Sequence, residues 1–160
     1  MKEHNKNKIK IFGYSGLIPF VLLSLIIWNS SEIWIIDMIF YLFCLYSLLI
    51  HSFLTGNLWT LSINQDKNVG IAIILFLSPL LLYVSTLFFF SFFQLQNIFQ
   101  NKLEKIILIL ILNLNFILVL IIEMKIFKSE TFYKKMRFNL TAIVTFCHIS
   151  IGLFIIYRVI

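Results

Sequence analysis

Charged residues are scarce in this sequence, and acidic residues are the scarcest. Only 12% of the 160 residues are Asp, Glu, Lys or Arg, about half the share found in water-soluble domains. Hydrophobic residues make up 61% instead, and the mean hydropathy is +0.98. A chain of this length cannot bury so much apolar surface in a core of its own. The composition therefore excludes a water-soluble globular domain.

Cysteine is limited to two residues, and the common catalytic motifs are missing. Cys44 and Cys147 lie inside apolar runs, where a thiol behaves as a small hydrophobic side chain. Neither belongs to a C-x-x-C pair, so a disulfide framework and a zinc site lack support. No G-x-S-x-G, H-E-x-x-H, phosphate-binding glycine loop or pair of carboxylates at helical spacing occurs. We expect no catalytic residues, no bound metal and no cofactor.

The hydrophobic residues fall into five runs, each close to the roughly 20 residues that a helix needs to cross a bilayer. The runs cover about 11–29, 33–58, 70–93, 106–122 and 138–157. They predict an all-α fold, a polytopic membrane protein formed by a helical bundle of about five transmembrane helices in one domain, 1–160. The polar stretches 64–68 and 94–105 are expected to be connections. No small-residue cleavage pattern follows the first run, which we interpret as an uncleaved span.

Pro79 lies inside the third run. Proline lacks a backbone N–H, so it leaves one carbonyl of the preceding turn unpaired and bends the helix. Spanning helices tolerate this when a neighbouring helix or a nearby hydroxyl, here Ser78, satisfies the freed group. We expect a kink at Pro79 and no break.

Lys and Arg gather on one side of the predicted spans. The N-terminus and the connections at 58–69 and 123–137 hold ten of them, and the opposite side holds three. The bias predicts an N-terminus inside, in the cytoplasm or an organelle matrix, and a C-terminus outside. The net charge of +6 then reflects membrane anchoring and not nucleic-acid binding. We expect the cations of 123–137 to attract anionic lipid headgroups.

Three groups of residues form recognisable motifs. The first span opens Phe12-Gly13-Tyr14-Ser15-Gly16-Leu17-Ile18-Pro19-Phe20; the second ends with Tyr46, Ile50, Ser52, Phe53, Leu54, Gly56 and Trp59; and Tyr133, Arg137, Leu140, Thr141 and Val144 lie near the C-terminus. They resemble the motifs G-Y-x-G-L-I-P-F, Y-x-x-x-I-x-S-F-L-x-G-x-x-W and W-Y-x-x-x-R-x-x-L-T-x-x-V. These belong to a family of small, uncharacterised bacterial inner-membrane proteins whose mitochondrial relative is called transmembrane protein 69.

The resemblance covers nearly the whole chain and implies a helical inner-membrane protein of unknown activity. It places the protein in a bacterial inner (plasma) membrane, or in the mitochondrial inner membrane if the source is eukaryotic. The sequence departs from the family pattern at four positions. Thr55 and Thr60 replace glycine, His51 replaces leucine, and Phe132 replaces tryptophan.

Polar residues of the second span recur at steps of three and four and so share one helix face. The face comprises Asp37, Tyr41, Cys44, His51 and Thr55. Ionisable residues inside a membrane suggest function, so His51 is a candidate for binding or proton handling. The alternative is an interhelical hydrogen bond. Haem ligation by His51 and His148 is disfavoured, because the two residues are expected to differ in depth by roughly 10 Å.

Gly13, Gly16 and Gly56 are expected at similar depth near the inner surface, with Tyr14 and Trp59 at the same level. Small residues allow close helix packing. The alternative is a lipid-headgroup or quinone pocket at that end of the bundle.

Glu123, Tyr133 and Arg137 bracket the basic inner segment. Glu123 is expected either to pair with Arg137 across the last two helices or to be solvated. Asn113 and Asn115 interrupt the fourth run, and we expect at least one of them to find an interhelical partner.

These features favour a non-enzymatic accessory or assembly subunit that presents lipid-facing helices to other membrane proteins. The phenylalanines at 88–93 suit such contacts, and lipid contact accounts for them equally. The alternative is a small transport or quinone- and redox-linked membrane protein that uses the polar face around His51. A membrane-embedded enzyme ranks third.

Overall fold

The computed structural model describes residues 3–92, 98–128 and 130–158. Six helices follow one another in these ranges: α1 (Glu3–Ser15), α2 (Ile18–Asn29), α3 (Ile33–Asn64), α4 (Val69–Phe92), α5 (Ile98–Ile126) and α6 (Thr131–Arg158). No strand occurs in the ranges described. Five helical stretches are long and apolar enough to cross a membrane, because α1 and α2 together form one of them, Lys6–Asn29. The expected all-α, five-span membrane fold is confirmed.

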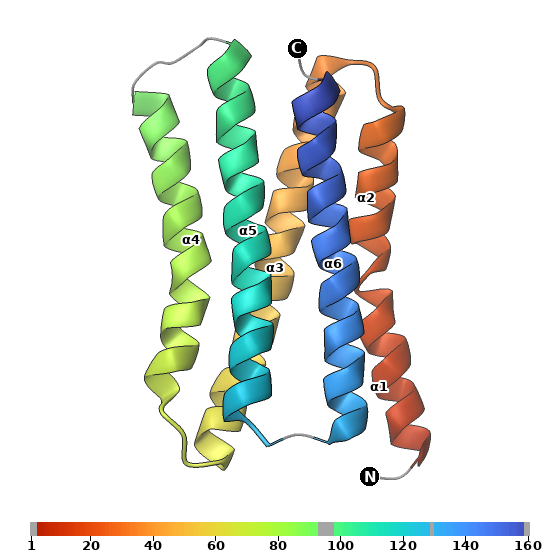
Figure 1. Cartoon of the computed structure of the whole chain (residues 1–160), viewed down its shortest axis with the longest axis vertical. Coiled ribbons are helices and arrows are strands. Elements are labelled where there is room, and N and C mark those ends of the chain that lie inside the picture. Colours follow the sequence, from red (N-terminus) through yellow and green to blue (C-terminus); the bar gives the residue numbers. More distant parts are fainter. Residues whose placement is uncertain (1–2, 93–97, 129, 159–160) are drawn as a thin grey trace.

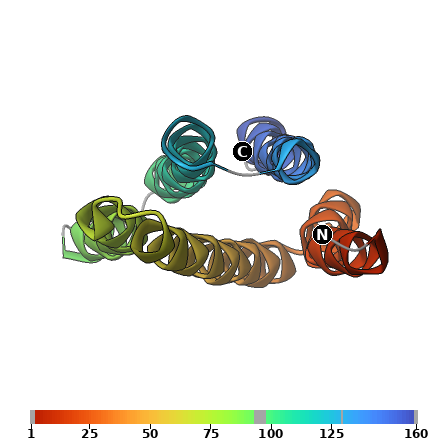
Figure 2. The same ribbon diagram turned by 90° about the horizontal axis from the view of Figure 1, so that it is seen from below.

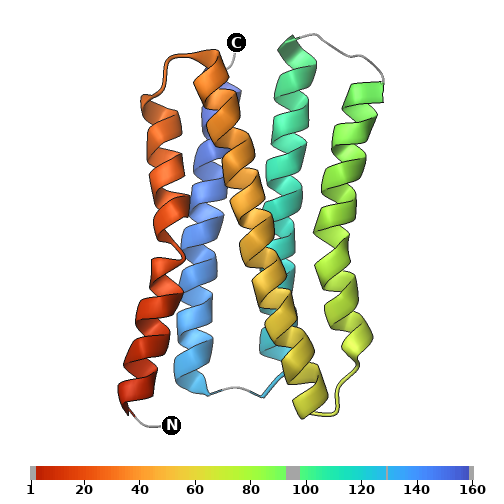
Figure 3. The same ribbon diagram turned by 180° about the vertical axis from the view of Figure 1, so that it is seen from behind.

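The helices form two layers. α2, α3 and α4 lie in one row, and α5 and α6 pack on one side of it (Figure 2). The long α3 is the middle helix of this row and is tilted relative to its neighbours α2 and α4 (Figure 3). The start of α1 lies at the same end as the α3–α4 and α5–α6 connections, and the last turn of α6 lies at the opposite end (Figure 1).

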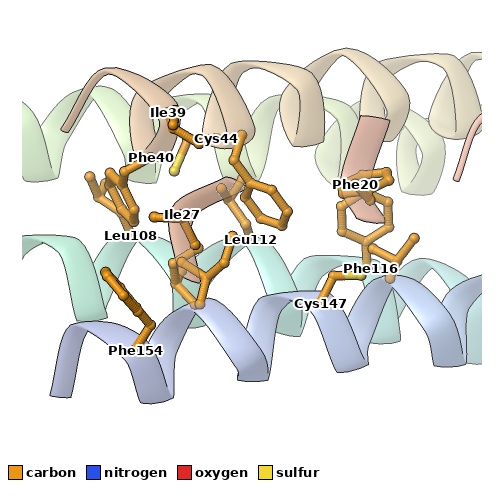
Figure 4. Close-up of a cluster of buried hydrophobic side chains, with 14 of the residues drawn as sticks. Phe20, Ile27, Ile39, Phe40, Cys44, Leu108, Leu112, Phe116, Cys147 and Phe154 are labelled. Atoms are coloured by element: carbon orange, nitrogen blue, oxygen red, sulfur yellow. The ribbon is translucent and has the colours of Figure 1, made fainter. Parts of the chain in front are cut away.

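The core between the layers consists mainly of aromatic and aliphatic side chains (Figure 4). The Phe20 ring packs edge-on against Phe43 at 5.4 Å and Phe116 at 6.1 Å between ring centroids. Cys44 and Cys147 are buried in this core with free thiols, in agreement with their expected role as small hydrophobic side chains. In lipid, such close packing holds helices together where the hydrophobic effect cannot.

The first span contains a break that was not expected. α1 ends at Ser15, and α2 begins at Ile18 with Pro19 in its first turn. Pro19 has no N–H for the Ser15 carbonyl, and its ring crowds that carbonyl four residues before it, so the helix is interrupted there. In α4, by contrast, the helix continues through Pro79, so the expected absence of a break is confirmed, while the expected kink stays a prediction.

Several helices extend beyond the hydrophobic runs. α3 continues to Asn64, α5 begins at Ile98, and α6 begins at Thr131. The expected connections at 94–105 and 123–137 are therefore largely helical, and Phe93 with residues 94–97 lies outside the described residues. Apolarity marks the hydrocarbon thickness, whereas a helix continues into the interface where long polar side chains reach water.

Candidate functional site

His51 donates a hydrogen bond across the helix interface to α4. Its Nε2 lies 2.8 Å from the carbonyl oxygen of Leu75. That carbonyl would ordinarily accept from the N–H four residues later, but the residue there is Pro79, which has none. His51 therefore caps the carbonyl that the proline frees, and its side chain is 1% exposed. This is the interhelical hydrogen bond given above as the alternative to a binding role.

Tyr46 performs a similar role toward the first span. Its hydroxyl donates to the carbonyl of Gly16 at 2.9 Å, within the α1–α2 break that Pro19 causes. Since Tyr46 and His51 both belong to α3, this helix satisfies a backbone carbonyl at the proline site of each neighbour in its layer. Of the other expected residues on α3, Ser52 donates its hydroxyl to the Leu48 carbonyl of its own helix.

His148 lies in an aromatic enclosure at the centre of the bundle. Its Nδ1 is 2.8 Å from the Val144 carbonyl and its Nε2 is 3.3 Å from the Ser47 hydroxyl. The rings of Phe20, Phe43 and Phe116 surround the imidazole, with centroids 4.9 to 5.9 Å from its own.

Both histidines pack against the same phenyl ring. The His51 and His148 centroids each lie 5.6 Å from that of Phe116. Ser47, the contact of His148, is one turn from His51 on α3, so His148 lies deeper along the bundle. Among the described residues, no group of three or more His, Cys, Asp and Glu side chains could hold a metal ion.

An ion pair joins α3 to α5 near the end of the bundle that holds the α2–α3 turn. Lys105 Nζ lies 2.5 Å from Asp37 Oδ1, with the lysine side chain 2% exposed and the aspartate 32% exposed. Asp37 thus keeps the access to water that was expected near a boundary. Lys105 was expected to belong to a connection between helices. This expectation is wrong, because Lys105 is part of α5 and its side chain is buried.

A second ion pair joins α5 to α6 at the other end. Arg137 Nε lies 2.9 Å from Glu123 Oε2, and both side chains are buried. Of the two arrangements left open for Glu123, the structure has the interhelical pair. Tyr133 lies on the same turn of α6 and accepts a hydrogen bond from Asn57 of α3 at 3.2 Å.

The two ion pairs mark two levels of the bundle. Lys105 and Glu123 lie five turns apart on the same face of α5, a separation of roughly 27 Å. The hydrocarbon core of a bilayer is about 30 Å thick. The charges therefore lie at the two ends of the apolar part of α5. At these ends the cost of burying a charge is lowest.

The three candidate glycines, Gly13, Gly16 and Gly56, have different surroundings. A Cβ on Gly13 would lie 3.3 Å from Leu140 of α6, so this glycine permits the close approach that was expected. Gly16 lies in the α1–α2 break. A Cβ on Gly56 would meet nothing within 4 Å, so the expected helix packing at Gly56 is wrong. Trp59 and Tyr14 are both exposed.

Asn115 has the expected interhelical partner. Its Oδ1 accepts from the hydroxyl of Ser78 on α4 at 3.0 Å. Ser78 therefore binds Asn115 and leaves the carbonyl freed by Pro79 to His51.

A sequence model of the family described as Protein of unknown function (DUF3429) matches residues 5–153. The chain belongs to the DUF3429 family. The expectation of an uncharacterised family is thereby confirmed, while kinship with transmembrane protein 69 stays a prediction. No curated protein matches the chain. No solved structure matches it.

Sequence reasoning found most of the polar residues of this DUF3429 protein but not their partners. It missed Lys105, because a lysine beside a polar stretch reads as a surface residue, and it missed Ser47. The signal for Leu75 was present, because Pro79 identifies the carbonyl four residues before it as the one needing a donor. The polar contacts that join one helix to another are those of Tyr46, His51, Asp37, Asn115 and Glu123.

Proposed function

We propose that this DUF3429 protein is a non-enzymatic accessory or assembly subunit of a larger membrane complex. One observation supports the proposal: several polar side chains of α3 bond to the neighbouring helices. His51, Tyr46 and Asp37 on α3 bond to α4, the α1–α2 break and α5 respectively. Polar side chains that bond helix to helix stabilise the bundle and are not available to bind a ligand. Such an arrangement suits a protein that acts through its outer surface.

The outer surface offers a large apolar face for such contacts. On α3, the side turned away from α5 and α6 carries Leu45, Leu49 and Phe53, which are 56%, 60% and 68% exposed. Gly56 on the same helix leaves open space beside them. α4 lies at the edge of its layer (Figure 2), and it is the least buried of the five spans. Lipid alone would cover these side chains as well, so an experiment must separate the two.

We further propose that the membrane is a bacterial inner membrane, with the start of α1 in the cytoplasm. Arg137 and Lys105 are buried in ion pairs and do not anchor the chain at the surface. Removing one cation from each side of the count leaves nine against two, so the positive-inside argument becomes stronger. Kinship with transmembrane protein 69 would extend the proposal to mitochondrial inner membranes.

The test is extraction of the tagged protein from native membranes in a mild detergent. A stoichiometric complex with larger membrane proteins is expected, and Gly56→Leu, which fills the open space on α3, should lose those partners. The matched control is Phe146→Ala on α6, a side chain 72% exposed outside the proposed face. A protein that always purifies alone, or partners retained by Gly56→Leu, contradicts the proposal.

A second candidate is a small transport or redox-linked protein that uses His51. The observation in its favour is that His51 Nδ1 is buried and has no hydrogen-bond partner among the described residues. Such a group costs stability, so its presence calls for an explanation. Proton flux in proteoliposomes, a bound quinone or haem absorbance, lost in His51→Leu, would support it. Unchanged growth and complex assembly in cells carrying His51→Leu would dismiss it.

A further inference from the structure

Two lysines of α1 lie over one aromatic ring of α6. The ammonium groups of Lys6 and Lys10 are 5.9 Å and 5.1 Å from the centroid of Phe132. Such cation–π contacts attract an ammonium group weakly at an exposed site. Lys6 also approaches Glu130 at 3.8 Å, and both of these side chains are substantially exposed.

Gly13 fixes α1 in this position. Its Cα lies so close to α6 that an added Cβ would be 3.3 Å from Leu140 and 3.6 Å from Met136. Gly13 thus lets the basic end of α1 lie beside the first turns of α6, where Lys134 and Lys135 follow Phe132. The approach of the two segments depends on a residue without a side chain.

The charges that meet here do not balance. Residues 6–15 and 130–137 contain five lysines besides Arg137, and their one acidic residue is Glu130. Arg137 is already paired with Glu123 inside the bundle. Positive charges held together in this way repel one another unless an anion lies close by.

The depth of the cluster identifies the source of that anion. The Glu123–Arg137 pair lies at a boundary of the hydrocarbon region, and Lys134 is one turn before Arg137 on the helix that leads out of it. The lysines therefore lie at the depth of the lipid headgroups, where each phosphate carries a negative charge.

We propose that the phosphate of an anionic lipid binds between α1 and the start of α6, among Lys6, Lys10 and Lys135, which is three residues from Phe132 and so shares its side of α6. It neutralises the repulsion between the two segments and holds α1 against α6. α1 continues into α2 through the break at Gly16 and Leu17, and its main contacts are with α6. Loss of the lipid would therefore loosen α1 and leave the rest of the bundle unchanged.

The test is native mass spectrometry of the full chain released from nanodiscs of phosphatidylcholine and phosphatidylglycerol. One phosphatidylglycerol is expected to remain bound in preference to phosphatidylcholine. Each lysine near an anionic lipid surface contributes about fivefold in affinity, so Lys135→Gln should weaken retention about fivefold. The matched control is Lys67→Gln, which makes the same charge change in the α3–α4 connection, at the far edge of the bundle from α1 (Figure 2).

Three outcomes would overturn the proposal. One is equal retention of the two lipids by the unchanged protein. Another is an equal loss in Lys67→Gln, which would show a diffuse surface charge and no site. The third is displacement of the lipid by millimolar inorganic phosphate, which would make the ligand a soluble anion. If Lys135→Gln fails to fold by circular dichroism, Lys10→Gln in α1 replaces it, with an about fivefold loss expected.

Discussion

His51 and Leu75 are joined by a hydrogen bond that repairs the effect of a proline. The imidazole Nε2 donates to the Leu75 carbonyl at 2.8 Å, and Pro79 is the reason that this carbonyl is available. Tyr46 similarly reaches Gly16 in the break that Pro19 causes. α3 therefore stabilises the irregular points of both of its neighbours, and His51 and Tyr46 are accounted for by hydrogen bonds to backbone carbonyls.

Tyr46→Phe should destabilise the protein by about 1 kcal/mol, the net contribution of a typical intramolecular hydrogen bond. The substitution removes only the hydroxyl that donates to Gly16. Unfolding of the purified protein in mixed micelles, followed as sodium dodecyl sulfate is added, measures the loss. Tyr14→Phe is the control, because Tyr14 lies near the same break on an exposed surface and should change stability little. Equal losses in the two variants would show that the Gly16 bond is not the cause.

Glu123→Leu should cost about 3 to 5 kcal/mol, because it leaves the buried Arg137 guanidinium without a counter-charge. The double variant Glu123→Leu with Arg137→Leu should cost less than the single one, because no unpaired charge remains. The same micelle titration measures both. A double variant that is less stable than Glu123→Leu alone would mean that Arg137 has another buried partner.

Gly13→Leu should destabilise the docking of α1 on α6 by about 1 to 3 kcal/mol, as overpacking does. The reason is the 3.3 Å that separates an added Cβ from Leu140. Gly56→Leu should change the stability of the isolated protein by no more than about 0.5 kcal/mol, because its Cβ would meet nothing within 4 Å. Thermal unfolding in detergent compares the two, and a reversed order would contradict the packing described.

Hydrophobic runs predicted the spans because lipid requires them, whatever the details of packing. The tolerated Pro79 also followed from the sequence, since proline leaves a carbonyl unpaired that a neighbour can satisfy. The pairing of Glu123 with Arg137 was one of the two arrangements that the sequence left open, and a buried charge needs such a partner. These are requirements that each residue carries with it into any fold.

The helix ends and the break at Pro19 were harder to predict. Pro79 and Pro19 are chemically the same, yet α4 continues through one and the first span stops at the other. The difference is tertiary: His51 bonds to Leu75 inside the helix, whereas Tyr46 bonds to Gly16 within an opened turn. Lys105 was misjudged for a related reason, because only the packing of α5 against α3 shows that Asp37 lies within its reach.

The central claim is that the polar residues of α3 join helices, and a double-mutant cycle between His51 and Pro79 tests it most directly. In the unchanged background, His51→Leu should cost about 1 to 2 kcal/mol, because the Leu75 carbonyl loses its donor. With Pro79→Ala, the N–H of residue 79 can bond to Leu75, and the cost of His51→Leu should fall below about 0.5 kcal/mol. The coupling between the two positions should then be roughly 1 kcal/mol. An equal cost of His51→Leu in both backgrounds would contradict the account.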